Sequence, residues 1–310
     1  MRFGAHAIAG IEDLSQRVYG AEIVATQLSA APCAGSLAHA MDDETAMTLG
    51  HFTGDLRLRG IMAPKVVTLV LILEQGRSMT RWDPDTRAHD LLVYPMGGDL
   101  EGHCRGSTRY AALKMPLEIL QRHAVAFEHL ADDRHWSTET RLRPPRGAAI
   151  GPEIGRRLER LLRLGPELDP GALIGLRDEV VDGFLAAADY AGAYQPDRQV
   201  WINGARILRR VEDYLDERPG RSVSIPELCQ ALSLSRRTLA RAFGEGLGVG
   251  PKTYLRLRAL SAARKALVAG RQAGASVTQV ALDHGFWELG RFSVAYREMF
   301  GESPSQTLRG

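Results

Sequence analysis

Hydrophobic and polar positions follow a two-residue period over the first part of this chain. From about Glu22 to Leu113, short runs of apolar and β-branched residues are separated by Gly, Pro and Asp, which is typical of β-strands. The runs read EIVATQL, AMTLGHF, LRLRGIM, VVTLVLIL, RSMTRW, HDLLVYP and RYAALKM. Seven short strands at this spacing predict a small barrel or sandwich.

From Pro116 the period becomes helical. The segments PLEILQRHAVAFEHL, PEIGRRLERLLRL and PGALIGLRDEVVDGFLAAADYA predict three helices. The third carries an apolar stripe made by Leu173, Leu176, Val180 and Phe184. We expect this stripe to form a dimerisation contact with a second copy of the chain. The pattern fits packing within one chain nearly as well, so both interpretations stay open.

The last third of the chain repeats one pattern. The segment PELCQALSLSRRTLARAFGEGLGVGPKTYL at 226–255 returns as TQVALDHGFWELGRFSVAYREMFGESPSQTL at 278–308. Leu239 and Gly248 correspond to Phe292 and Gly301 at one constant separation along the sequence. Corresponding residues nearer the start of the two copies are separated by one residue less. The second copy therefore has one extra residue in its turn. Each copy is typical of a helix-turn-helix, two short helices that meet at a tight turn.

The first unit spans about residues 226–247. Ser224 and Ser235 are expected helix N-caps, and Leu239 and Phe243 turn inward. The residues left outward, which we predict to contact DNA, are Ser235, Arg236, Arg237, Thr238, Ala240 and Arg241. An arginine fork can bond guanine O6 and N7 together or clamp a phosphate. A solvated charged face would explain one such helix equally well, but its duplication favours DNA.

The second unit spans about residues 277–300 and is less basic. The residues predicted to face DNA here are Leu289, Gly290, Arg291, Ser293, Val294 and Arg297. We expect this helix to read bases weakly, through a thymine methyl or DNA shape, with its arginines on phosphates. One helix over Tyr254–Ala269, roughly 24 Å long, would set the two recognition helices about one DNA turn, ~34 Å, apart.

RTLARAFGEGLGVGPKTYLRLRAL in the first unit and GFWELGRFSVAYREMFGESPSQTL in the second resemble the AraC/XylS family of bacterial transcription regulators. The resemblance covers about residues 205–309, and GFWELGRFSVAYR is most similar to the branch of the ethanolamine-operon regulator. It implies a cupin-like barrel, a small-molecule effector, a homodimer and contact with RNA polymerase. The expected α+β chain has a sensing barrel at 1–115, a helical linker or dimerisation segment at 116–202 and a double helix-turn-helix domain at 203–310.

Charge is distributed in the way a DNA-binding segment requires. Residues 203–310 carry 17 Lys and Arg against 10 Asp and Glu, a net of +7, which leaves −5 for residues 1–202 of a chain whose total is +2. A basic C-terminal part beside an acidic N-terminal part is expected when only one of them meets phosphate. With no run of eighteen apolar residues and no leader pattern, we expect a cytoplasmic protein with no membrane partner.

Catalytic and metal chemistry find little support in the residues. Cys33, Cys104 and Cys229 form no paired motif, and His39, His51, His89 and His103 include no His-x-His with a nearby Glu. We therefore expect no metal, no cofactor and no enzyme. Arg81, Trp82 and Tyr94 are candidates for an effector pocket that suits a carboxylated or aromatic ligand, although packing explains Trp82 and Tyr94 as well.

The sequence therefore predicts a DNA-binding transcription regulator, an effector-responsive activator on family resemblance. Two alternatives remain open. One is a constitutive DNA-binding regulator whose barrel serves dimerisation only. The other is a cupin-type enzyme that carries a DNA-binding tail.

Overall fold

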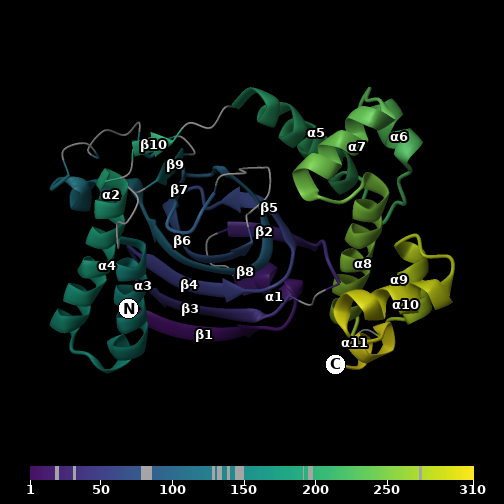
Figure 1. The fold of residues 1–310 in the computed structure, drawn as a ribbon. Helices are drawn as coiled ribbons and strands as arrows, with labels where there is room; N and C mark the ends of the chain where they lie inside the picture. The colour runs from purple at the N-terminus through teal and green to yellow at the C-terminus, as the bar shows by residue number, and fades with distance from the viewer. Residues whose placement is uncertain are drawn as a thin grey trace.

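The computed structural model describes the chain apart from residues 18–20, 31–32, 78–85, 128–129, 131–134, 138–139, 144–149, 191, 195–197 and 272–273. Its N-terminal region is rich in antiparallel strands, and its C-terminal region is helical and lies to one side of the sheet (Figure 1). The expected α+β class is confirmed.

The described strands form one antiparallel sheet in the order β1-β3-β4-β8-β6-β7-β9-β10, with β5 paired to β8 and β2 paired to β5. Their bounds are β1 (Arg2–Ile8), β2 (Ala21–Gln27), β3 (Gly35–Met41), β4 (Ala46–Phe52), β5 (Leu56–Met62), β6 (Val67–Arg77), β7 (Leu91–Tyr94), β8 (Asp99–Met115), β9 (Thr140–Arg143) and β10 (Gly192–Tyr194). Strand β8 joins two parts of the sheet, because its first third pairs with β5 and its remainder with β4 and β6.

The sheet is open, which corrects the expectation of a closed barrel. Among the described strands, β1 and β10 end the main path and do not pair with each other. The short strands β9 and β10 extend the sheet beyond β7 instead of returning it to β1. Strands β4 and β5 coincide with predicted runs, whereas β1 and β3 were not predicted because their Gly, Ala and His content gives a weak strand signal.

Helices α2 (Leu117–Ala124), α3 (Ile150–Leu164) and α4 (Pro170–Tyr190), with the short helix η3 (Gly165–Glu167), cover one face of the sheet (Figure 1). Leu176, Val180 and Phe184 are buried there in one cluster with strand residues, and Leu173 packs at its edge. This corrects the expectation that the stripe faces a second copy: it covers the chain's own sheet, so the alternative of packing within one chain holds.

A second cluster fills the inside of the N-terminal region, on the sheet face that points away from α3 and α4. It joins Leu37 of β3 and Phe52 of β4 to Leu56 of β5 and Cys104 of β8, with helix α1 (Ile11–Arg17) at one end. The curled sheet therefore has an interior and a helix-covered exterior.

The C-terminal helices form two small cores that share one long helix. Their bounds are α5 (Arg198–Asp216), α6 (Ile225–Ala231), α7 (Arg236–Leu247), α8 (Pro251–Ala269), α9 (Val277–Asp283), α10 (Leu289–Phe300) and α11 (Pro304–Arg309). The first core buries Leu239 and Phe243, and the second buries Phe292 and Tyr296. The predicted pairing of these residues between the two copies is confirmed.

The two copies also end alike. Helix α7 stops at Gly248 with φ 69°, and α10 stops at Gly301 with φ 76°. Only glycine adopts this left-handed conformation without strain, so both positions allow the chain to turn back toward its core. Pro251 and Pro304 then open the following helices α8 and α11.

Candidate nucleic-acid interface

Helix α7 presents the predicted residues of the first unit. Ser235 caps it, because its hydroxyl accepts a hydrogen bond from the Thr238 backbone N–H at 3.0 Å. The side chains of Arg236, Arg237 and Arg241 are exposed while the opposite face of the helix is buried in the first core. The guanidinium groups on this face are therefore accessible to a large anion, and their contact with DNA stays a prediction.

Helix α10 presents a different surface at the corresponding place. Leu289 and Val294 are 39% and 59% exposed, which is unusual for large apolar side chains. Arg291 lies beside them and bonds Glu288 at 3.0 Å. Gly290, Ser293 and Arg297 lie on the same helix, Ser293 partly buried and the other two exposed. The second unit thus offers apolar surface where the first offers arginine.

Trp287 was missed by the sequence reasoning. It is 76% exposed, and it falls in the turn between Phe286 and the N-cap Glu288. The first copy has no residue at this place, since Leu234 is followed directly by its N-cap Ser235. The extra residue of the second copy is therefore an exposed tryptophan at the start of its recognition helix. The one-residue change of offset could have identified it.

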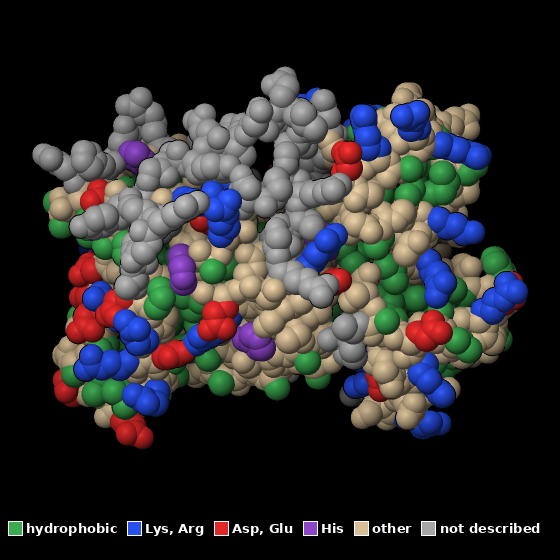
Figure 2. Space-filling view, in the orientation of Figure 1, with side chains coloured by type: hydrophobic (Ala, Val, Ile, Leu, Met, Phe, Trp, Pro, Cys, Tyr) green, Lys and Arg blue, Asp and Glu red, His purple; other side chains and the backbone are tan. Residues whose placement is uncertain are grey.

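Helix α8 separates the two units. Its 19 residues correspond to roughly 28 Å at 1.5 Å per residue. Tyr254 near its start belongs to the first core, and Leu260 and Leu267 belong to the second. Lys and Arg side chains gather over this helical region on the side away from the sheet (Figure 2). Helix α8 therefore connects the two units, and its length is close to one DNA turn, ~34 Å.

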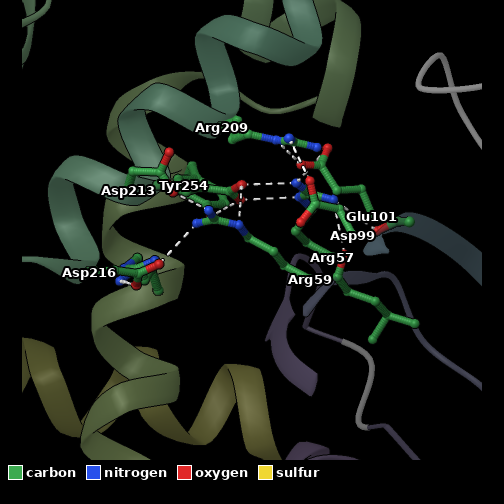
Figure 3. A network of polar contacts seen from close by, with 12 residues as sticks. Arg57, Arg59, Asp99, Glu101, Arg209, Asp213, Asp216 and Tyr254 are labelled. Carbon is green, nitrogen blue, oxygen red and sulfur yellow. Dashed lines mark hydrogen bonds and ion pairs between the residues drawn. The ribbon is translucent and has the colours of Figure 1, made fainter. Parts of the chain in front are cut away.

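A buried ion pair fastens this helical region to the sheet. Arg57 of β5 donates two hydrogen bonds to the Glu212 carboxylate of α5, at 3.1 and 2.8 Å, and the Tyr254 hydroxyl donates a third at 2.6 Å (Figure 3). Arg57 and Glu212 are each 1% exposed. Burial, together with the Glu212 carboxylate, raises the pKa of Tyr254 far above its ordinary range, so the phenol remains a donor.

More exposed ion pairs surround this buried pair. Arg59 of β5 bonds Asp216 at 2.9 Å and contacts Asp213, while Arg209 of α5 bonds Asp99 and Glu101 of β8 (Figure 3). The second unit is tied as well, since Gln27 of β2 donates to the Met299 carbonyl at 2.8 Å. Both helix-turn-helix units are therefore held against the N-terminal region.

The predicted effector residues are only partly placed. Arg81 and Trp82 lie outside the described residues. Tyr94 ends β7 opposite Thr68 of β6 and is 6% exposed. His103 is buried, and burial together with Arg105 lowers its pKa to about 4, so it is neutral near pH 7. Within the described ranges, no group of three or more His, Cys, Asp or Glu could hold a metal ion.

Comparison with known proteins places the similarity in the helical region. The family described as "Helix-turn-helix domain" matches residues 228–310. A "XylDLEGF operon transcriptional activator 2" of Pseudomonas putida is 38% identical over 111 residues, which cover 36% of this chain and 71% of that protein. The HTH-type transcriptional activator RhaS of Escherichia coli O139:H28 is 33% identical over 108 residues, 35% of this chain and 38% of that protein.

The match to longer relatives is local. The chain spans about a third of the length of a XylDLEGF operon transcriptional activator of Pseudomonas putida, 35% at 38% identity. A solved structure titled as a probable AraC family transcriptional regulator from Rhodopseudomonas palustris is 34% identical over 34% of this chain and 95% of its own, with a TM-score of 0.31. The sequence matches, and not the overlays of whole chains, therefore carry the assignment.

Proposed function

This chain belongs to the AraC/XylS family of helix-turn-helix transcription regulators, and on that premise we propose that it is a sequence-specific DNA-binding activator that responds to a small-molecule effector. The observation that carries the DNA part is the pair of exposed recognition helices α7 and α10 on one rod, α8. The positive charge of residues 203–310 supports it, because phosphate contacts supply much of the affinity of such proteins for DNA.

The two units are proposed to divide the work. Arg237 and Arg241 on α7 read guanine edges, since an arginine fork matches the O6 and N7 acceptors. Helix α10 contributes apolar contact through Leu289 and Val294, with Trp287 beside the helix start. Thymine methyl groups in the major groove are the base atoms that such side chains suit. Arg297 contacts the phosphate backbone of the DNA.

The test uses the full chain and duplexes that it selects from a randomised pool. Arg237→Ala or Arg241→Ala is expected to weaken the selected site by about 1 to 3 kcal/mol and to relax base preference at one position. Arg297→Ala is expected to weaken selected and scrambled duplexes alike. Arg160→Ala on α3, an exposed arginine of the N-terminal region, is the matched control and should change neither.

Failure to select any duplex, with binding that does not fall as salt rises, would overturn the proposal. Unchanged base preference in both α7 variants would overturn the division of work between the units while leaving DNA binding intact.

Finer points rest on resemblance alone. We propose a cytoplasmic homodimer that contacts RNA polymerase, and the branch of the ethanolamine-operon regulator on the segment GFWELGRFSVAYR. We also propose that the chain divides into domains at 1–115, 116–202 and 203–310. No described helix is long and apolar enough to cross a bilayer. No described feature favours the cupin-type enzyme with a DNA-binding tail.

A further inference from the structure

Three large apolar side chains are exposed together at the start of α10. Trp287, Leu289 and Val294 are 76%, 39% and 59% exposed. The other exposed large apolar residues of the described ranges are scattered along the sequence from Val24 to Ile174. Exposed apolar side chains that gather in one place mark a binding surface, whereas single ones need no explanation. The start of α10 is therefore a surface that awaits a partner.

This surface stands where the first unit has arginines. The pairing of Leu239 with Fhe292 sets the correspondence between the recognition helices. At that separation, the places of Arg236, Arg237 and Arg241 on α7 are taken on α10 by Leu289, Gly290 and Val294. The apolar residues therefore occupy the positions from which the first unit is proposed to contact bases.

The first turn of α10 offers few hydrogen-bonding groups to a base. Arg291 bonds the N-cap residue Glu288 at 3.0 Å, so its charge has a partner on the same helix. A Cβ added at Gly290 would meet nothing within 4 Å, so the surface is open there. Ser293 is partly buried. What this turn presents to a partner is mainly apolar.

The major groove of DNA holds one apolar group that such a surface can recognise. Thymine carries a methyl group at C5, whereas the other groups at the base edges are hydrogen-bond donors and acceptors. Cytosine methylated at C5 carries the same methyl group at the same place. Apolar side chains sense this methyl group, and they do not distinguish the O4 acceptor of thymine from the N4 donor of cytosine.

We infer that the start of α10 recognises the C5 methyl group of a pyrimidine, that Trp287 determines this specificity, and that 5-methylcytosine can replace thymine there. Trp287 carries the largest side chain of the three and the largest exposed fraction. The inference rests on the proposed DNA-binding function and names the base feature that the second unit reads. Methylation of a cytosine at this position would then strengthen binding to an unchanged sequence.

A protein partner is the other occupant that an exposed apolar surface suits. DNA is favoured because the surface lies at the start of a recognition helix and because Arg297 is exposed further along the same helix. Residues 203–310 also carry a net charge of +7, which attracts a polyanion. The experiment below distinguishes the two occupants.

The test uses the full chain and a duplex that it selects from a randomised pool. Each thymine is replaced in turn by deoxyuridine, which removes only the methyl group. At the responsive position, four pairs are then compared: T·A with U·A, and 5-methylcytosine·G with C·G. We expect the methylated member of each comparison to bind about fourfold more tightly, which is the effect of burying one methyl group.

Trp287→Ala is expected to abolish this methyl preference in both comparisons, and Trp287→Phe to retain most of it. Val294→Ala should reduce it. Val125→Ala is the matched control, because Val125 is 77% exposed and lies in the N-terminal region. Since the replaced side chains are exposed, none of these variants should lower the thermal midpoint, and a loss of preference cannot then come from a loss of fold.

Three outcomes would overturn the inference: no thymine responds to removal of its methyl group, Trp287→Ala keeps the full preference, or 5-methylcytosine binds no better than cytosine. A Trp287→Ala variant that binds the duplex as the wild type does but fails to activate transcription would also overturn it, and would assign the surface to a protein partner. If a duplex is selected and depends on Arg237 but not on any methyl group, this inference fails and the proposed function stands. If no duplex is selected, both fail.

Discussion

Arg57 and Lys114 are both cations buried in strands of one sheet, but they differ in what surrounds the charge. Arg57, 1% exposed, meets the Glu212 carboxylate through two hydrogen bonds, and that carboxylate accepts a third from Tyr254. Lys114, 6% exposed, meets no carboxylate among the described residues. A complete pair can join two regions of a protein, whereas an unpaired charge lowers stability unless something binds it.

The largest expected effect comes from breaking the complete pair. Glu212→Ala removes both hydrogen bonds to the Arg57 guanidinium and leaves it only the Glu101 carboxylate at 3.5 Å, and it should lower the free energy of unfolding by about 3 to 5 kcal/mol. Urea denaturation followed by circular dichroism measures it. A loss below about 1 kcal/mol would mean that water reaches Arg57 and that the contact between the two regions opens in solution.

A double replacement sharpens this point. Because an apolar pair of similar volume avoids the desolvation of both ions, Arg57→Met with Glu212→Met should recover much of the loss seen in Glu212→Ala. If the double variant is as unstable as Glu212→Ala, the ion pair itself stabilises the contact between β5 and α5. In that case the loss in Glu212→Ala does not come from the charge left behind.

Lys114 should respond with the opposite sign. Lys114→Met removes a charge that burial penalises, and the free energy of unfolding near pH 7 should rise by about 1 to 3 kcal/mol. Lys65→Met, exposed on a turn, should stay within about 0.5 kcal/mol of the wild type. A less stable Lys114→Met would mean that the ammonium contributes to the stability of the fold.

The stability gain of Lys114→Met should also depend on pH. Burial lowers the pKa of Lys114 from 10.5 to about 8 in the folded chain, so between these values the unfolded chain binds more protons and wild-type stability rises with pH. The loss of wild-type stability caused by the buried ammonium is complete below about pH 8 and fades as the pH approaches 10.5. The difference between wild type and Lys114→Met should therefore fall by about half from pH 7 to pH 9.5. A constant difference would mean that burial does not shift the pKa of Lys114 in the folded chain.

The helical region could be predicted from the sequence better than the surroundings of either buried cation. Local signals specify that region: Ser235 caps α7, and Gly248 and Gly301 end the two recognition helices. Arg57 and Lys114 carry no such signal, because strand pairing and residues far along the chain decide whether a strand cation meets a carboxylate. Glu212 lies 155 positions after Arg57. The same limit explains the stripe of α4, since an amphipathic helix does not reveal which apolar surface it covers.

The smallest effect is expected at the ion pairs that surround the Arg57–Glu212 pair, because they are exposed to solvent. Arg59 is 23% exposed, and its partners Asp213 and Asp216 are each 51% exposed. Asp213→Asn should therefore lower the free energy of unfolding by no more than about 1 kcal/mol. Added salt should reduce this loss, because salt screens exposed charges. The loss in Glu212→Ala should change little with salt, since the charge it leaves behind is buried. Urea midpoints at low and high ionic strength test both variants together. Equal salt sensitivity would mean that burial does not distinguish the Arg57–Glu212 pair from the exposed pairs around it.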